Sequence, residues 1–105
     1  MYTKIMVKLN KKISSCTGFE WDRGNATKNW DRHEVSEGEC EQIFFNKPLI
    51  MKRDKKHSDT ENRYYTLERT NQNRLLFAVF TVRKDKIRII SARDMTDAET
   101  EMYII

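Results

Sequence analysis

The stretch RLLFAVFTVRKDKIRIISAR, residues 74–93, decides the fold. Its two halves, 74–83 and 85–93, are rich in β-branched and aromatic residues and are joined by a short polar link, which predicts two adjacent antiparallel strands. The segment LLFAVF is apolar at successive positions rather than at alternate ones. We therefore expect this strand in the centre of a sheet, with both of its faces covered.

Two further strands are expected before this stretch, PLIMKR at 48–53 and NRYYTLER at 62–69. Side chains alternate between the faces of a strand, so Arg63 shares a face with Tyr65 and Arg69. An arginine between isoleucines is costly to desolvate, and Arg88 must therefore reach an anion, a carboxylate or water. Alternation in the last strand predicts Arg88, Ile90 and Ala92 on one face and Ile87, Ile89, Ser91 and Arg93 on the other.

Helix signals lie on both sides of the strands. Asp22 can act as the N-cap of a helix that ends near His33. The S-x-x-E pattern at 36–39 predicts a second helix that ends before Pro48, and the T-x-x-E pattern at 96–99 predicts a last one. The sequence therefore predicts an α+β domain with two N-terminal helices, a four-stranded antiparallel sheet and a C-terminal helix.

The length of 105 residues fits one domain, which we place at 19–105 after an N-terminal extension at 1–18. No apolar run is long enough for a signal peptide or a membrane span. Cys16 and Cys40 are too few for a disulfide framework, and a reducing cytoplasm is the simpler location. Helical spacing predicts that Cys40 is buried and that Trp21 and Trp30 pack inside the fold rather than stack on bases.

The net charge of +4 and the pI near 9.1 are mildly basic. Acidic residues concentrate at 34–41 and after Asp94, whereas the stretch 47–93 is strongly basic. A basic centre between acidic flanks favours nucleic acid as a partner of one face. The alternative is an ordinary solvated surface of mixed charge.

No Gly-rich phosphate loop, metal-ligand spacing or standard hydrolase motif is present, so we expect neither cofactor nor metal. Metal-free RNA cleavage needs a group that takes the 2′-hydroxyl proton, cations that stabilise the phosphate, and an acid. His33 and His57 titrate near neutrality in their unperturbed state, and Glu68 could share the role. His33 can equally contact the last carbonyls of its helix, His57 can be an inert loop residue, and Arg63 can be surface decoration.

Several stretches together resemble the BrnT family of bacterial toxins, the ribonuclease half of a type II toxin–antitoxin pair. They are FEWD at 19–22, N-x-x-R-H-x-V-S at 29–36, RYYT at 63–66 and the stretch 74–93. The resemblance implies a RelE-like fold and metal-independent RNA cleavage that inhibits translation. It also implies neutralisation by a BrnA-like ribbon-helix-helix antitoxin, in a heterotetramer that contacts DNA through the antitoxin.

Carried onto this chain, the family's basic positions fall on Arg32, His33, Arg63, Arg69, Arg83, Arg88 and Arg93, and Glu68 is added for its chemistry alone. We divide these residues into a catalytic set and an RNA-binding set. The catalytic set is His33, Arg63, Glu68 and Arg88, and the RNA-binding set is Arg32, Arg69, Arg83 and Arg93. The chain departs from the family pattern at Asn25, Arg32, Glu34 and Glu68. Arginine cannot donate a proton near neutral pH, so position 32 is a poor acid. Two alternatives remain: a basic module that binds RNA or the antitoxin without cleaving, and a domain whose charges are merely solvated.

Overall fold

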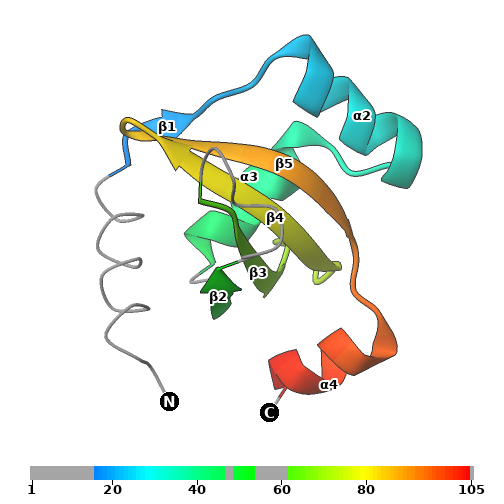
Figure 1. Cartoon of the computed structure of the whole chain (residues 1–105). Helices are drawn as coiled ribbons and strands as arrows, with labels where there is room; N and C mark the ends of the chain where they lie inside the picture. The colour runs from blue at the N-terminus through cyan, green and yellow to red at the C-terminus, as the bar shows by residue number, and fades with distance from the viewer. Residues whose placement is uncertain (1–15, 47–48, 54–61, 105) are drawn as a thin grey trace.

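The computed structural model describes residues 16–46, 49–53 and 62–104, which form one sheet with helices packed around it (Figure 1). The helix α3 lies behind the sheet, α2 runs along the β5 edge, and α4 follows the end of β5. The elements in chain order are β1 (Gly18–Phe19), α2 (Arg23–His33), α3 (Glu37–Phe45), β2 (Leu49–Arg53), β3 (Tyr64–Arg69), β4 (Leu75–Arg83), β5 (Lys86–Asp94) and α4 (Asp97–Ile104).

The predicted antiparallel run of four strands is confirmed, but the sheet as a whole is mixed. Its order is β1-β5-β4-β3-β2, and β1 pairs with β5 in parallel. The Thr17 N–H donates to the Asp85 carbonyl at 2.7 Å, and the Glu20 N–H donates to the Ile87 carbonyl at 2.9 Å. A two-residue strand is too short for a period-two pattern, which is why alternation could not reveal it.

The three predicted helix starts are confirmed by their caps. Asp22 Oδ1 accepts from the Asn25 N–H at 3.0 Å, and Ser36 Oγ accepts from the Glu39 N–H at 3.1 Å. Thr96 Oγ1 accepts from the Glu99 N–H at 3.2 Å in the same way. The boundary between an extension and the domain at residue 19 stays a prediction, because residues 1–15 lie outside the described ones.

The main core lies between the sheet and the helices α2 and α3. Cys40 is fully buried there, as predicted, and burial raises the pKa of its thiol to about 12. Trp30 contradicts its prediction, because 54% of it is exposed on α2. The buried positions of α2 belong instead to two amides, Asn25 and Asn29, which apolar periodicity does not detect.

The strand β5 contains a bulge that corrects its predicted faces. Phe80 pairs with Ile89 and Val79 pairs with Ser91, so Ile90 is an extra residue. One extra residue reverses the alternation beyond it. Ala92 therefore joins Ile89 in the core, and Ser91 and Arg93 move to the face that carries Arg88.

Two asparagines of α2 satisfy the backbone of β5 around this bulge. Asn25 Nδ2 donates to the Ile89 carbonyl at 2.9 Å, and Asn29 Oδ1 accepts from the Ala92 N–H at 3.0 Å. These contacts lie beyond the two residues that pair with β1, where no strand of the described residues adjoins the outer edge of β5. Since buried backbone groups need partners, the two amides make it possible to bury this edge.

Candidate nucleic-acid interface

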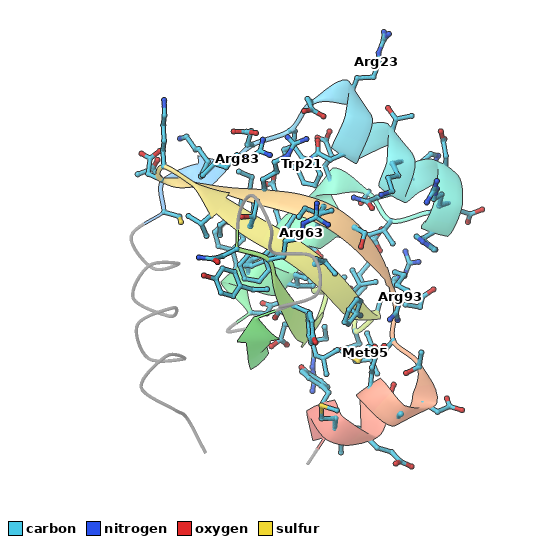
Figure 2. The ribbon with its side chains drawn as sticks, viewed as in Figure 1. Trp21, Arg23, Arg63, Arg83, Arg93 and Met95 are labelled. Carbon is cyan, nitrogen blue, oxygen red and sulfur yellow. The ribbon has the colours of Figure 1, made fainter. Side chains whose placement is uncertain are left out.

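The face of the sheet opposite α2 and α3 is here called the open face, although Thr81 and Leu67 on it are buried. It carries two predicted catalytic arginines in one row. Tyr64 pairs with Phe80, so Arg63, one residue earlier, lies opposite Thr81 of β4. Thr81 pairs with Arg88 of β5 on its other side, so it lies between the two arginines. Neighbouring strands are about 4.8 Å apart, which sets the backbones of Arg63 and Arg88 about 10 Å apart. Figure 2 shows Arg63 in front of the sheet, with Arg83 near the β4–β5 turn.

Arg88 is held by two carboxylates of the segment that precedes α2. Its Nη1 donates to Glu20 Oε1 at 3.0 Å, and its Nη2 pairs with Asp22 Oδ2 at 2.8 Å. Arg83 Nη1 contacts the same Glu20 oxygen at 3.3 Å. The pKa of Asp22 is lowered by its hydrogen bond from the Asn25 amide and by Arg88. The predicted need of Arg88 for a partner is thus confirmed, and the partner is carboxylate.

Arg93 lies on the same face as Arg88 and is held by α4. Its Nη1 and Nη2 donate to the two carboxylate oxygens of Glu99 at 2.8 and 3.0 Å. Its guanidinium carbon stands 4.1 Å from the ring centroid of Phe77. The Arg93 hydrogen bonds lower the pKa of Glu99 despite its partial burial. The guanidinium is therefore fixed in place over an aromatic ring.

Glu68 and Arg69 meet at the end of β3, apart from the arginine row. The Tyr103 hydroxyl donates to Glu68 Oε2 at 2.6 Å and accepts from Arg69 Nε at 3.1 Å. Burial raises the pKa of Tyr103, and Glu68 acts in the same direction. All three residues line a shallow cleft of about 630 Å³. Glu68 is only 5% exposed, so the main role of its carboxylate is the hydrogen bond with Tyr103.

Arg32 and His33 lie in the exposed last turn of α2. The His33 carbonyl accepts from Arg74 Nη2 at 3.1 Å, and Arg74 also pairs with Asp94 and Glu39. The His33 charge is among the influences that lower the pKa of Asp94, after the Arg74 hydrogen bond. The backbone of His33 is thus tied through Arg74 to the end of β5, apart from the arginine row.

The predicted catalytic residues therefore occupy three places: the arginine row, the end of β3 and the end of α2. His57 lies outside the described residues. Sequence reasoning missed Glu20 as a partner of two arginines, although the FEWD motif contains it, and treated Asp22 only as a cap. It also missed the partly buried rings of Tyr65 and Phe77 on the open face, because alternation alone does not say which face stays open.

Within the described ranges, no three or more His, Cys, Asp or Glu side chains are grouped to bind a metal ion. Every described helix is too short or too polar to span a bilayer.

The fold is similar to that of the Brucella abortus ribonuclease toxin BrnT, whose crystal structure it matches with a TM-score of 0.57 at 13% identity. The match covers 76% of this chain and 97% of that one. The two proteins thus share the arrangement of their sheet and helices. A search of curated protein sequences found no match. Residues 21–99 match the family described as "Ribonuclease toxin, BrnT, of type II toxin-antitoxin system", so the chain belongs to the BrnT family. Membership implies an antitoxin partner.

Proposed function

We propose that this chain is a toxin endoribonuclease that cleaves single-stranded RNA without a metal ion and thereby inhibits translation in the cytoplasm. The observation that carries the proposal is the row of Arg63, Thr81 and Arg88 on the open face, with Arg83 two residues beyond Thr81. Long guanidinium side chains that flank β4 on one face of the sheet can bind the two free oxygens of one phosphodiester and stabilise the extra charge that develops during cleavage. The family description of a ribonuclease toxin supports the same reaction class.

Attack of the ribose 2′-hydroxyl on the adjacent phosphorus requires a base, and two groups are candidates. His33 is the residue that sequence reasoning favoured. Glu20 is the carboxylate that contacts both Arg83 and Arg88, so it lies where a bound phosphate would be held. The variants His33→Ala and Glu20→Gln separate these candidates. If one of the two residues is the base, its variant loses cleavage but still binds RNA.

The partner proposed for this toxin is a BrnA-like ribbon-helix-helix antitoxin, with which it forms a heterotetramer that contacts DNA through the antitoxin. A toxin that carries a basic face and has a cognate antitoxin can be neutralised when the antitoxin covers that face. Purification of the co-expressed pair and measurement of its mass test the stoichiometry.

The decisive experiment measures cleavage of a fluorescent single-stranded RNA by the purified chain in EDTA. Arg63→Gln and Arg88→Gln should each reduce the rate by about a hundredfold or more, the usual cost of one transition-state donor. Arg23→Gln is the matched control, because it removes the same charge from an exposed residue that points away from the sheet (Figure 2). Melting temperatures show whether each variant remains folded.

Full activity in EDTA supports the metal-free mechanism, and cleavage that returns only with added metal contradicts it. Undiminished cleavage by both arginine variants contradicts the site. An intact chain that binds the antitoxin but cleaves no RNA identifies the second candidate function, a basic binding module. The carboxylates that already pair with Arg88 favour that alternative, because they make this residue partly structural.

A further inference from the structure

The open face carries an aromatic pair that none of the roles above uses. Tyr65 of β3 and Phe77 of β4 have ring centroids 5.7 Å apart and an interplanar angle of 39°. Both rings are partly buried and partly exposed. Tyr65 pairs with Val79 and Leu67 pairs with Phe77, so the two rings are diagonal neighbours on the sheet. Leu67 lies beside Phe77 on the same face and is fully buried.

Basic groups border this pair at both ends. Arg63 comes directly before β3, two residues before Tyr65 and on the same face, so its backbone is about 7 Å away. Arg93 stands over Phe77 at 4.1 Å and is fixed by Glu99. A planar guanidinium beside aromatic rings offers a second flat surface for stacking.

We propose that Tyr65, Phe77 and Arg93 form a platform on which one base of single-stranded RNA stacks while the neighbouring phosphate binds at Arg63. This inference rests on the proposed function, because it names a subsite for the same substrate. Aromatic residues on an open sheet, flanked by cations that follow the backbone, are the usual means of holding single-stranded RNA. Stacking needs a flat ring and not a particular base edge, so the subsite tolerates more than one base.

The alternative occupant is a segment of the antitoxin, which could insert an apolar side chain between the same rings. Charge favours RNA only through the part that the carboxylates leave, since Arg63, Arg88 and Arg93 share the face but Glu20, Asp22 and Glu99 already pair with the last two. RNA brings one negative charge with every nucleotide and can compete for these arginines along the whole face. A protein segment would need acidic residues in matching positions to offset the same cations.

The test uses the full chain and a short RNA whose 2′-hydroxyls are methylated, so that it binds without being cleaved, with 2-aminopurine at one position. Stacking on a ring quenches the fluorescence of this base. Tyr65→Leu and Phe77→Leu keep an apolar side chain but remove the ring. Tyr65→Phe keeps the ring, and Phe45→Leu is the matched control because Phe45 is 75% exposed at the end of α3.

We expect the intact chain to quench the probe. The two leucine variants should bind the RNA at least about tenfold more weakly and should quench the probe little. Tyr65→Phe and Phe45→Leu should behave as the intact chain does. With cleavable RNA the leucine variants should show a raised KM and a nearly unchanged kcat, which a general loss of folded protein would not produce.

Unchanged affinity and quenching in both leucine variants overturn the platform, whether or not the intact chain cleaves RNA. Quenching by an intact chain that cleaves nothing keeps the platform and rejects the nuclease. Leucine variants that bind RNA normally but lose the antitoxin assign the face to the protein partner and also overturn the proposal.

Discussion

The replacement Asn29→Ala tests whether α2 supports β5 through its amides. Asn29 is 1% exposed, accepts from the Ala92 N–H and donates to the Asn25 carbonyl at 3.0 Å. Alanine leaves a buried N–H without its acceptor, which costs about 1–3 kcal/mol, and removes a second hydrogen bond worth about 1 kcal/mol. Alanine has a higher helix propensity than asparagine, which offsets roughly 0.6 kcal/mol of this loss. We therefore expect a loss of about 2–3 kcal/mol in the free energy of unfolding.

Thermal unfolding followed by circular dichroism measures this loss. For a domain of this size, about 2–3 kcal/mol lowers the melting temperature by roughly 10–20 °C. Thr27→Ala on the same helix is the control, since Thr27 is exposed and its replacement should leave stability unchanged or slightly higher.

Asn29→Asp makes the test sharper, because it keeps an acceptor for Ala92 and removes the donor to Asn25. It also buries a carboxylate beside a carbonyl oxygen, and burial raises the pKa of such a group. The aspartate variant should therefore be less stable than the alanine variant at pH 7 and should recover as the pH falls toward 5. A loss below about 0.5 kcal/mol for Asn29→Ala would refute the view that this amide makes burial of the β5 edge possible.

Two further predictions concern the charges around α4 and β5. Glu99→Gln removes the anion that holds Arg93, so RNA should bind a few-fold more tightly. If the freed Arg93 gains a phosphate contact, the slope of log affinity against log salt should steepen by about 0.7. Unchanged affinity and an unchanged slope in a salt titration would show that Glu99 does not compete with RNA for Arg93. The pKa of Asp94 is lowered from 3.8 by Arg74, and that of Glu99 from 4.5 by Arg93. Their folded values lie below the unfolded ones, so this stability is complete above about pH 5 and is lost as the pH falls through the folded pKa. Urea unfolding at several pH values should show a decline below pH 4 that Arg93→Gln makes shallower, and equal declines would contradict the assignment.

Much of the fold could be predicted from local signals. The capping residues at 22, 36 and 96 fixed three helix starts, because each cap satisfies specific N–H groups of the first turn. The long apolar run at 75–80 predicted the central position of β4 correctly. The prediction that both faces are covered was wrong, because Leu75, Phe77 and Val79 on one face stay partly exposed. The parallel pairing of β1 and the bulge at Ile90 are set by tertiary contacts, so neither left a periodic signal.

The candidate site was predictable by residue type but not by arrangement. Arg63 and Arg88 share a row because of strand register, and Arg93 joins their face only through the bulge. Glu68 is grouped with these arginines by chemistry alone and His33 by chemistry and the family resemblance. In the structure the Glu68 carboxylate contacts Tyr103, and the His33 carbonyl contacts Arg74. Sequence shows which groups can react, whereas the register of β3, β4 and β5 decides which of them meet.

The open face is less positive than a count of its arginines suggests. Arg88 is held by Glu20 and Asp22, and Arg93 is held by Glu99. A phosphate that binds either guanidinium must compete with a carboxylate already in place, so RNA gains only the difference between the two contacts. The carboxylates in turn keep the arginines extended and oriented, which lowers the entropy lost on binding. These ion pairs therefore weaken RNA binding because the carboxylates compete with phosphate, and they favour it because they orient the arginines. Mutation of an acidic partner keeps the arginine and so separates the two effects, whereas mutation of the arginine removes both.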